Sequence, residues 1–107
     1  MIAIALLLFA QSVPQSMLAT ADNANAAYVQ CLFATSRAAN GAHLSVYAFE
    51  GKLASACGAE EQAIVRATSA VLERRGERNA EATARQLARD ARRSVLETYR
   101  TTIDLRQ

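Results

Sequence analysis

Residues 79–103 read NAEATARQLARDARRSVLETYRTTI and carry the clearest helical pattern in the chain. Asn79 is a good N-cap residue, and Glu81 follows in the first turn, where a carboxylate interacts favourably with the helix dipole. Apolar side chains then recur every three or four residues, which is the spacing of one helix face. They are Ala84, Leu87, Ala88, Ala91, Val95, Leu96, Tyr99 and Ile103. The pattern predicts a long amphipathic helix that buries this face.

A first helix is predicted over residues 22–39. Asp22, Asn23 and Asn25 are candidate N-caps, and Gly41 follows as a stop in the left-handed conformation. Its apolar face has the same helical spacing and consists of Ala24, Ala27, Tyr28, Cys31, Leu32, Thr35 and Ala38, with Val29 and Phe33 at the edges. This face is expected to pack on the helix that follows.

A second helix is predicted from Ser45 to Gly76. Its apolar positions are Val46, Phe49, Leu53, Cys57, Ile64, Ala67, Val71 and Leu72. Gly51 and Gly58 lie inside it, and each costs about 1 kcal/mol relative to Ala. A break at Gly58 would place Glu60 and Glu61 in the acidic first turn of a separate helix, which is the favoured interpretation. In the alternative, one of these glutamates points inward and pairs with an arginine of another helix.

No stretch of the chain alternates with period two for long enough to predict a strand. We therefore expect an all-α fold, a small bundle of three helices or, with the break at Gly58, four. The 107 residues carry a net charge of only +2, which suits one domain over residues 22–107 and does not imply a polyanionic partner.

Residues 1–21, MIAIALLLFAQSVPQSMLATA, resemble a cleavable export signal. An unbroken apolar run over residues 2–10 is followed by a polar segment with Pro14, and Ala19-Thr20-Ala21 has small residues at the −3 and −1 positions of a peptidase site. The alternative is a retained anchor, but a membrane-spanning helix needs roughly 20 apolar residues. We expect a signal peptide over residues 1–21 and a periplasmic or secreted protein.

Cys31 and Cys57 are the one chemically specific pair. In an oxidising compartment, two cysteines in a small exported domain are usually bonded to each other. Their spacing is unlike the C-x-x-C motif of a redox site. We expect one intramolecular disulfide between the first and second predicted helices, worth ~3.5 kcal/mol by the chain-entropy model.

Neither a metal site nor a catalytic site is expected. His43 is the only histidine, and together with two bonded cysteines it is too little for zinc, which needs three or four protein ligands. No G-x-S-x-G turn accompanies it. We therefore expect His43 to be an exposed turn residue and the protein to have no cofactor and no enzymatic activity.

Six arginines are predicted to lie opposite the apolar face of the last helix. This arginine stripe consists of Arg78, Arg85, Arg89, Arg92, Arg93 and Arg100. Neighbouring Glu81, Asp90 and Glu97 are spaced to pair with it, so a solvated polar face is the favoured interpretation.

The leading functional hypothesis is a non-catalytic module that binds an unknown protein partner in the cell envelope or outside the cell. The alternative is an anion-binding module in which the arginine stripe contacts phospholipid, lipopolysaccharide or nucleic acid. Nucleic acid is not expected as the ligand, because no aromatic side chains accompany the stripe. Membrane contact is expected only through an uncleaved N-terminus or an anionic surface.

Overall fold

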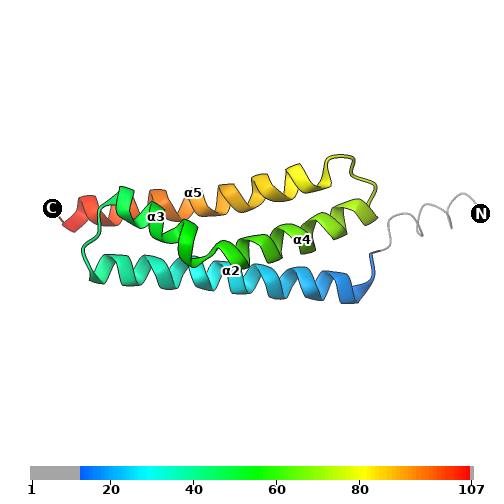
Figure 1. Cartoon of the computed structure of the whole chain (residues 1–107), viewed down its shortest axis with the longest axis horizontal. Helices are drawn as coiled ribbons and strands as arrows, with labels where there is room; N and C mark the ends of the chain where they lie inside the picture. Colours follow the sequence, from blue (N-terminus) through cyan, green and yellow to red (C-terminus); the bar gives the residue numbers. More distant parts are fainter. Residues whose placement is uncertain (1–12, 107) are drawn as a thin grey trace, which may run out of the picture.

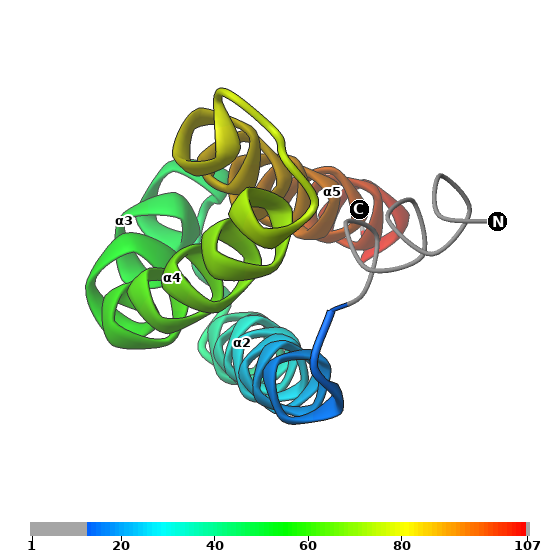
Figure 2. The same ribbon diagram turned by 90° about the vertical axis from the view of Figure 1, so that its right-hand side faces the viewer.

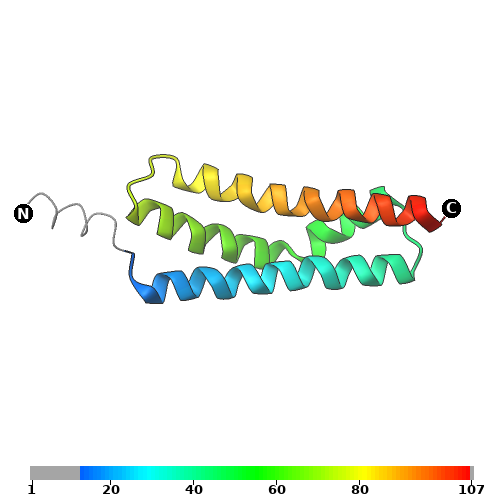
Figure 3. The same cartoon turned by 180° about the vertical axis from the view of Figure 1, so that it is seen from behind.

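The described part of the chain, residues 13–106 of a computed structural model, is an elongated bundle of four helices (Figure 1). In chain order they are α2 (Gln15–Gly41), α3 (Val46–Ala56), α4 (Gly58–Arg74) and α5 (Ala80–Arg106). The two long helices, α2 and α5, run the length of the bundle, while α3 and α4 follow one another beside them (Figure 3). The all-α prediction is confirmed, and residues 13–106 form four helices.

The predicted second helix divides at a single residue. Ser45 caps the start of α3, where its hydroxyl oxygen accepts a hydrogen bond from the Ala48 amide at 3.1 Å. Cys57 ends α3 and precedes α4, and its amide bonds to Leu53 while its carbonyl accepts from Glu61. Because both helical hydrogen-bond ladders reach Cys57, the chain changes direction there without leaving these groups unpaired.

The first helix begins earlier than predicted. It starts at Gln15, and the carbonyl of Pro14 accepts hydrogen bonds from the Met17 and Leu18 amides. Proline disfavours helical geometry in the preceding residue, which accounts for a start at this point. The prediction that Asp22, Asn23 or Asn25 caps the helix is therefore wrong, since all three lie inside α2.

The predicted export signal is only partly within the described residues. Its apolar run, residues 2–10, lies outside them, and Ala19-Thr20-Ala21 falls within α2. Cleavage after Ala21 stays a prediction.

The turns after α2 and α4 each contain one residue with a positive φ, but the residue type differs between them. Gly76 has a φ of 88° just after α4, the left-handed conformation that glycine adopts without steric cost. After α2, the left-handed residue is His43, with a φ of 55°, and Gly41 is still helical. The predicted stop at Gly41 is confirmed, since α2 ends there, but the prediction that Gly41 itself is left-handed is wrong. Histidine is one of the non-glycine residues that tolerate this conformation.

Large side chains from three helices fill the core. Tyr28, Leu32, Phe49, Leu53 and Tyr99 are at most 1% exposed. The rings of Phe49 and Tyr99 lie 4.2 Å apart, and the Tyr99 hydroxyl donates to the Leu44 carbonyl at 2.7 Å. The predicted apolar faces are thus largely the buried ones.

Four predicted apolar positions are exposed instead. They are Ala27, Phe33, Ala38 and Leu87. Along the bundle, α3 occupies one half and α4 the other (Figure 1). Seen end-on, the helices therefore form a three-sided arrangement around the core, in which each helix has two neighbours at any level (Figure 2). Residues at the edge of a predicted face therefore remain uncovered. None of the helices in residues 13–106 has both the length and the hydrophobicity required to cross a membrane.

Candidate functional site

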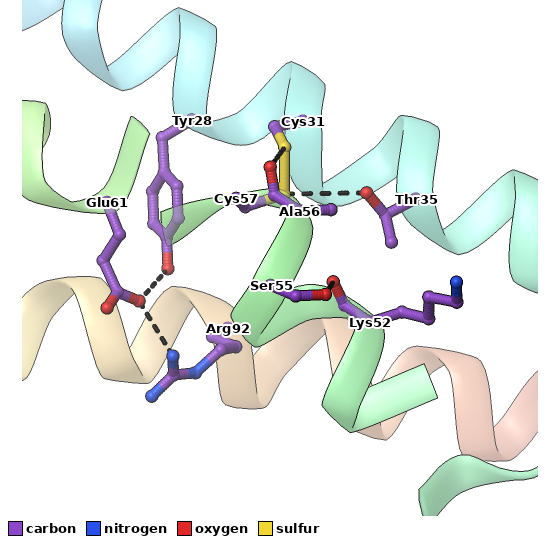
Figure 4. The surroundings of a disulfide bond; sticks show 9 residues. All are labelled: Tyr28, Cys31, Thr35, Lys52, Ser55, Ala56, Cys57, Glu61 and Arg92. Atoms are coloured by element: carbon purple, nitrogen blue, oxygen red, sulfur yellow. Dashed lines mark hydrogen bonds and ion pairs between the residues drawn. A yellow bond between two sulfur atoms is a disulfide. The ribbon is translucent and has the colours of Figure 1, made fainter. Parts of the chain in front are cut away.

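A disulfide joins Cys31 on α2 to Cys57 at the α3–α4 junction (Figure 4). Their Cα atoms are 5.8 Å apart, within the range that a disulfide bridges, and Cys57 is only 2% exposed. The predicted pairing is confirmed. Because the bonded residue is the junction itself, the disulfide holds α2 at the point where the chain turns from α3 into α4.

Beside the disulfide, Tyr28, Glu61 and Arg92 connect α2, α4 and α5 (Figure 4). The Tyr28 hydroxyl lies 2.9 Å from Glu61 Oε1 and 3.0 Å from the Ala88 carbonyl oxygen, and both atoms accept. Arg92 Nη1 donates to the same Glu61 oxygen at 3.0 Å. Burial, reinforced by the hydrogen bond to Glu61, raises the pKa of Tyr28 well above its ordinary value of 10.0.

This network reconciles the two interpretations of the paired glutamates. Glu60 and Glu61 do form the acidic first turn of α4, as the favoured interpretation predicted. Glu61 also pairs with an arginine of another helix, as the alternative proposed. The sequence offered only an indirect signal for the third member, because a buried tyrosine needs a partner for its hydroxyl but the pattern does not identify it.

The arginine stripe is less uniform than predicted. Arg92 is half-buried against Glu61, Arg85 pairs with Glu81 at 2.6 Å, and Arg93 lies 3.9 Å from Asp90. Arg78 lies in the turn before α5 rather than on the helix, which corrects its assignment to the stripe. Arg89 and Arg100 are exposed on α5 and form no ion pair within residues 13–106. Much of the positive charge is therefore compensated within the chain.

His43 is exposed in the α2–α3 turn, as predicted. Its Nδ1 lies 2.7 Å from Arg106 Nη1, and since a guanidinium can only donate, Nδ1 accepts. Arg106 also donates to the Asn40 carbonyl at 3.2 Å. These two bonds attach the last turn of α5 to the end of α2 and to the turn that follows it.

The same end of the bundle carries the most exposed large apolar side chains. Tyr47, in the first turn of α3, is 88% exposed, and Leu105, in the last turn of α5, is 83% exposed. Between these elements lies a shallow pocket whose apolar lining consists of Leu44, Val46 and Ile103. We call Tyr47, Leu105 and this lining the apolar end; it lies beside the C-terminus in Figure 1.

Among the described residues, no three His, Cys, Asp or Glu side chains gather in a group able to hold a metal ion. Comparison with known proteins adds no relative: no family model matches the chain, and neither the curated proteins nor the solved structures contain a match.

Proposed function

We propose that this protein is an exported, non-catalytic binding module that contacts a protein partner through the apolar end of its bundle. The observation that carries the proposal is that Tyr47 and Leu105 are both more than four-fifths exposed at the end of the bundle that also holds a pocket with Leu44, Val46 and Ile103 in its lining. Tyrosine is enriched among the residues that dominate binding energy, since it combines a large apolar surface with a polar tip.

Two further features support this proposal. The disulfide favours an oxidising compartment, such as the periplasm or the cell exterior. The bonds from Arg106 to the end of α2 and to the turn that follows it fix the elements that present the apolar end. A surface fixed before binding loses less conformational entropy when a partner docks.

The anion-binding alternative has weaker support. Three members of the arginine stripe already face carboxylates, and phosphate contacts would have to compete with those pairs.

Site-specific photo-crosslinking in the native host tests the proposal. Benzoylphenylalanine in place of Tyr47 should give a discrete heterologous adduct after irradiation, and Leu105→Ser in the same chain should weaken it strongly. The matched control places the probe at Glu77, which is exposed in the turn at the opposite end. Equal labelling from positions 47 and 77, or an adduct that Leu105→Ser leaves unchanged, would refute a contact at the apolar end.

A further inference from the structure

The solvent-facing side of α4 carries an unusual row of residues. The row consists of Ala59, Gln62, Ala63, Arg66, Ala70 and Glu73, all of them exposed. Arg74, the last residue of α4, is exposed too but is not part of the lining of the groove beside this row. Positions three or four residues apart share one helix face. Only Arg66 and Glu73 in this row are charged, they have opposite signs, and seven residues, or about two helical turns, separate them. Neither forms an ion pair within residues 13–106.

A groove runs along the α5 side of this row. Val65 and Ser69, at 8% and 9% exposure, form its floor, and its volume is about 440 Å³. On the α5 side its wall includes Glu81 and Arg85, which neutralise each other through their own ion pair. Glu61 of α4 also lines the groove, but it is paired with Arg92, so among the described residues the unpaired charges on the α4 wall are those of Arg66 and Glu73.

We propose that this groove binds α4 of a second copy of the chain, antiparallel and about a two-fold axis. The midpoint between Arg66 and Glu73 falls between Ser69 and Ala70. A two-fold axis there places each Arg66 opposite Glu73 of the other copy and makes two equivalent ion pairs. Serine and alanine at the crossing point are small enough to let the two helices approach closely.

The arrangement of charge favours a second copy over an unrelated partner. An isologous interface must be complementary to itself, and two opposite charges placed equally on either side of a small-residue centre meet that requirement. A purely acidic or purely basic partner would satisfy one of these two charges and oppose the other. This inference goes beyond the proposed function, because it concerns a different surface. The apolar end lies beyond α4, at the other end of the bundle, and would be present twice in the dimer (Figure 1).

Sedimentation velocity on the purified, disulfide-bonded protein tests the proposal. A contact along one helix about 25 Å long is small, so we expect a reversible dimer at roughly 10–200 µM protein. Arg66→Glu and Glu73→Arg each place like charges opposite one another twice, and each should weaken dimerisation at least about tenfold. Arg89→Glu makes the same change of net charge as Arg66→Glu on an exposed part of α5, and it should leave dimerisation unchanged.

Mixing the two single variants separates a specific interface from a defect in folding. In a mixed dimer of Arg66→Glu with Glu73→Arg, every facing pair again joins opposite charges, so the two weakened variants should associate with each other. A mixture of Arg89→Glu with Glu73→Arg should associate no more than Arg89→Glu does by itself. A protein that stays monomeric at every concentration, or single variants that do not associate when mixed, would overturn the proposal.

Discussion

At the scale of single residues, Tyr28 is the side chain that links α2 to both α4 and α5. It lies in the middle of the apolar face of α2 and is 1% exposed, yet its hydroxyl reaches both a carboxylate and a backbone carbonyl. A buried hydroxyl is stable only when hydrogen-bonded. These hydrogen bonds fix the rotation of α2 about its axis relative to α4 and α5. Apolar contacts have no directional preference and do not determine this rotation by themselves.

Tyr28→Phe should make stability less dependent on alkaline pH. The folded-state pKa of Tyr28 lies above its ordinary value, so its contribution is present below pH 10 and is lost as the pH rises and the unfolded state ionises. At pH 10.5, about 0.8 kcal/mol of that contribution should be gone. Urea denaturation of both proteins at pH 8 and pH 10.5 measures this, and the other tyrosines cancel in the comparison. A difference between the two proteins that stays constant or grows with pH would contradict the assignment.

Arg92 and Arg89 should respond differently to the same substitution. Arg92→Gln removes the cation that faces half-buried Glu61 and should lower the free energy of unfolding by about 1–2 kcal/mol. Arg89 is exposed and bonds only to the Gln86 side chain, so Arg89→Gln should change stability by less than about 0.5 kcal/mol. Urea denaturation at pH 7 compares them, and equal effects would mean that the Glu61–Arg92 pair adds nothing.

At the scale of helices, the turn from α3 into α4 organises the bundle. The sequence indicated a break near Gly58 as one of two outcomes, because glycine carries an intrinsic cost inside a helix, and the four-helix outcome is the one observed. The start of α2 was not predictable in the same way. Asp22, Asn23 and Asn25 are good caps by residue type, but a cap acts only at a helix end, and partly buried Met17, Leu18 and Ala21 allow the helix to continue past them. At this point tertiary packing outweighs the capping preference of these three residues.

Removing the disulfide should loosen this junction. Changing Cys31 and Cys57 together to alanine should lower the free energy of unfolding by about 2–5 kcal/mol, since the unfolded chain loses a closed loop. Urea denaturation of the double variant measures it, with the reduced, unaltered protein as the matched control. Unfolding curves that overlay those of the oxidised protein would show that the bond contributes no stability.

At the scale of the whole molecule, the all-α class and the cysteine pair could be predicted because both depend on patterns within the sequence. The charged contacts could not. Whether Arg92 meets Glu61 or water depends on how α4 and α5 are rotated about their axes, and residue spacing along one helix does not determine that rotation. The apolar end could not be predicted either, because Tyr47 and Leu105 are far apart in sequence and come to the same end of the bundle only after folding.

The central claim is that this protein is exported and closed by a disulfide. Non-reducing tryptic mapping tests both parts of the claim, on protein purified from its native host and alkylated before digestion. Cleavage at Arg37, Lys52 and Arg66 isolates each cysteine in its own peptide. We predict a single linked species, residues 22–37 joined to residues 53–66, whose mass reports both the bond between Cys31 and Cys57 and an N-terminus at Asp22. Alkylated, unlinked peptides containing Cys31 and Cys57 would contradict the disulfide, and a linked species that retains residues before Asp22 would contradict processing at that site.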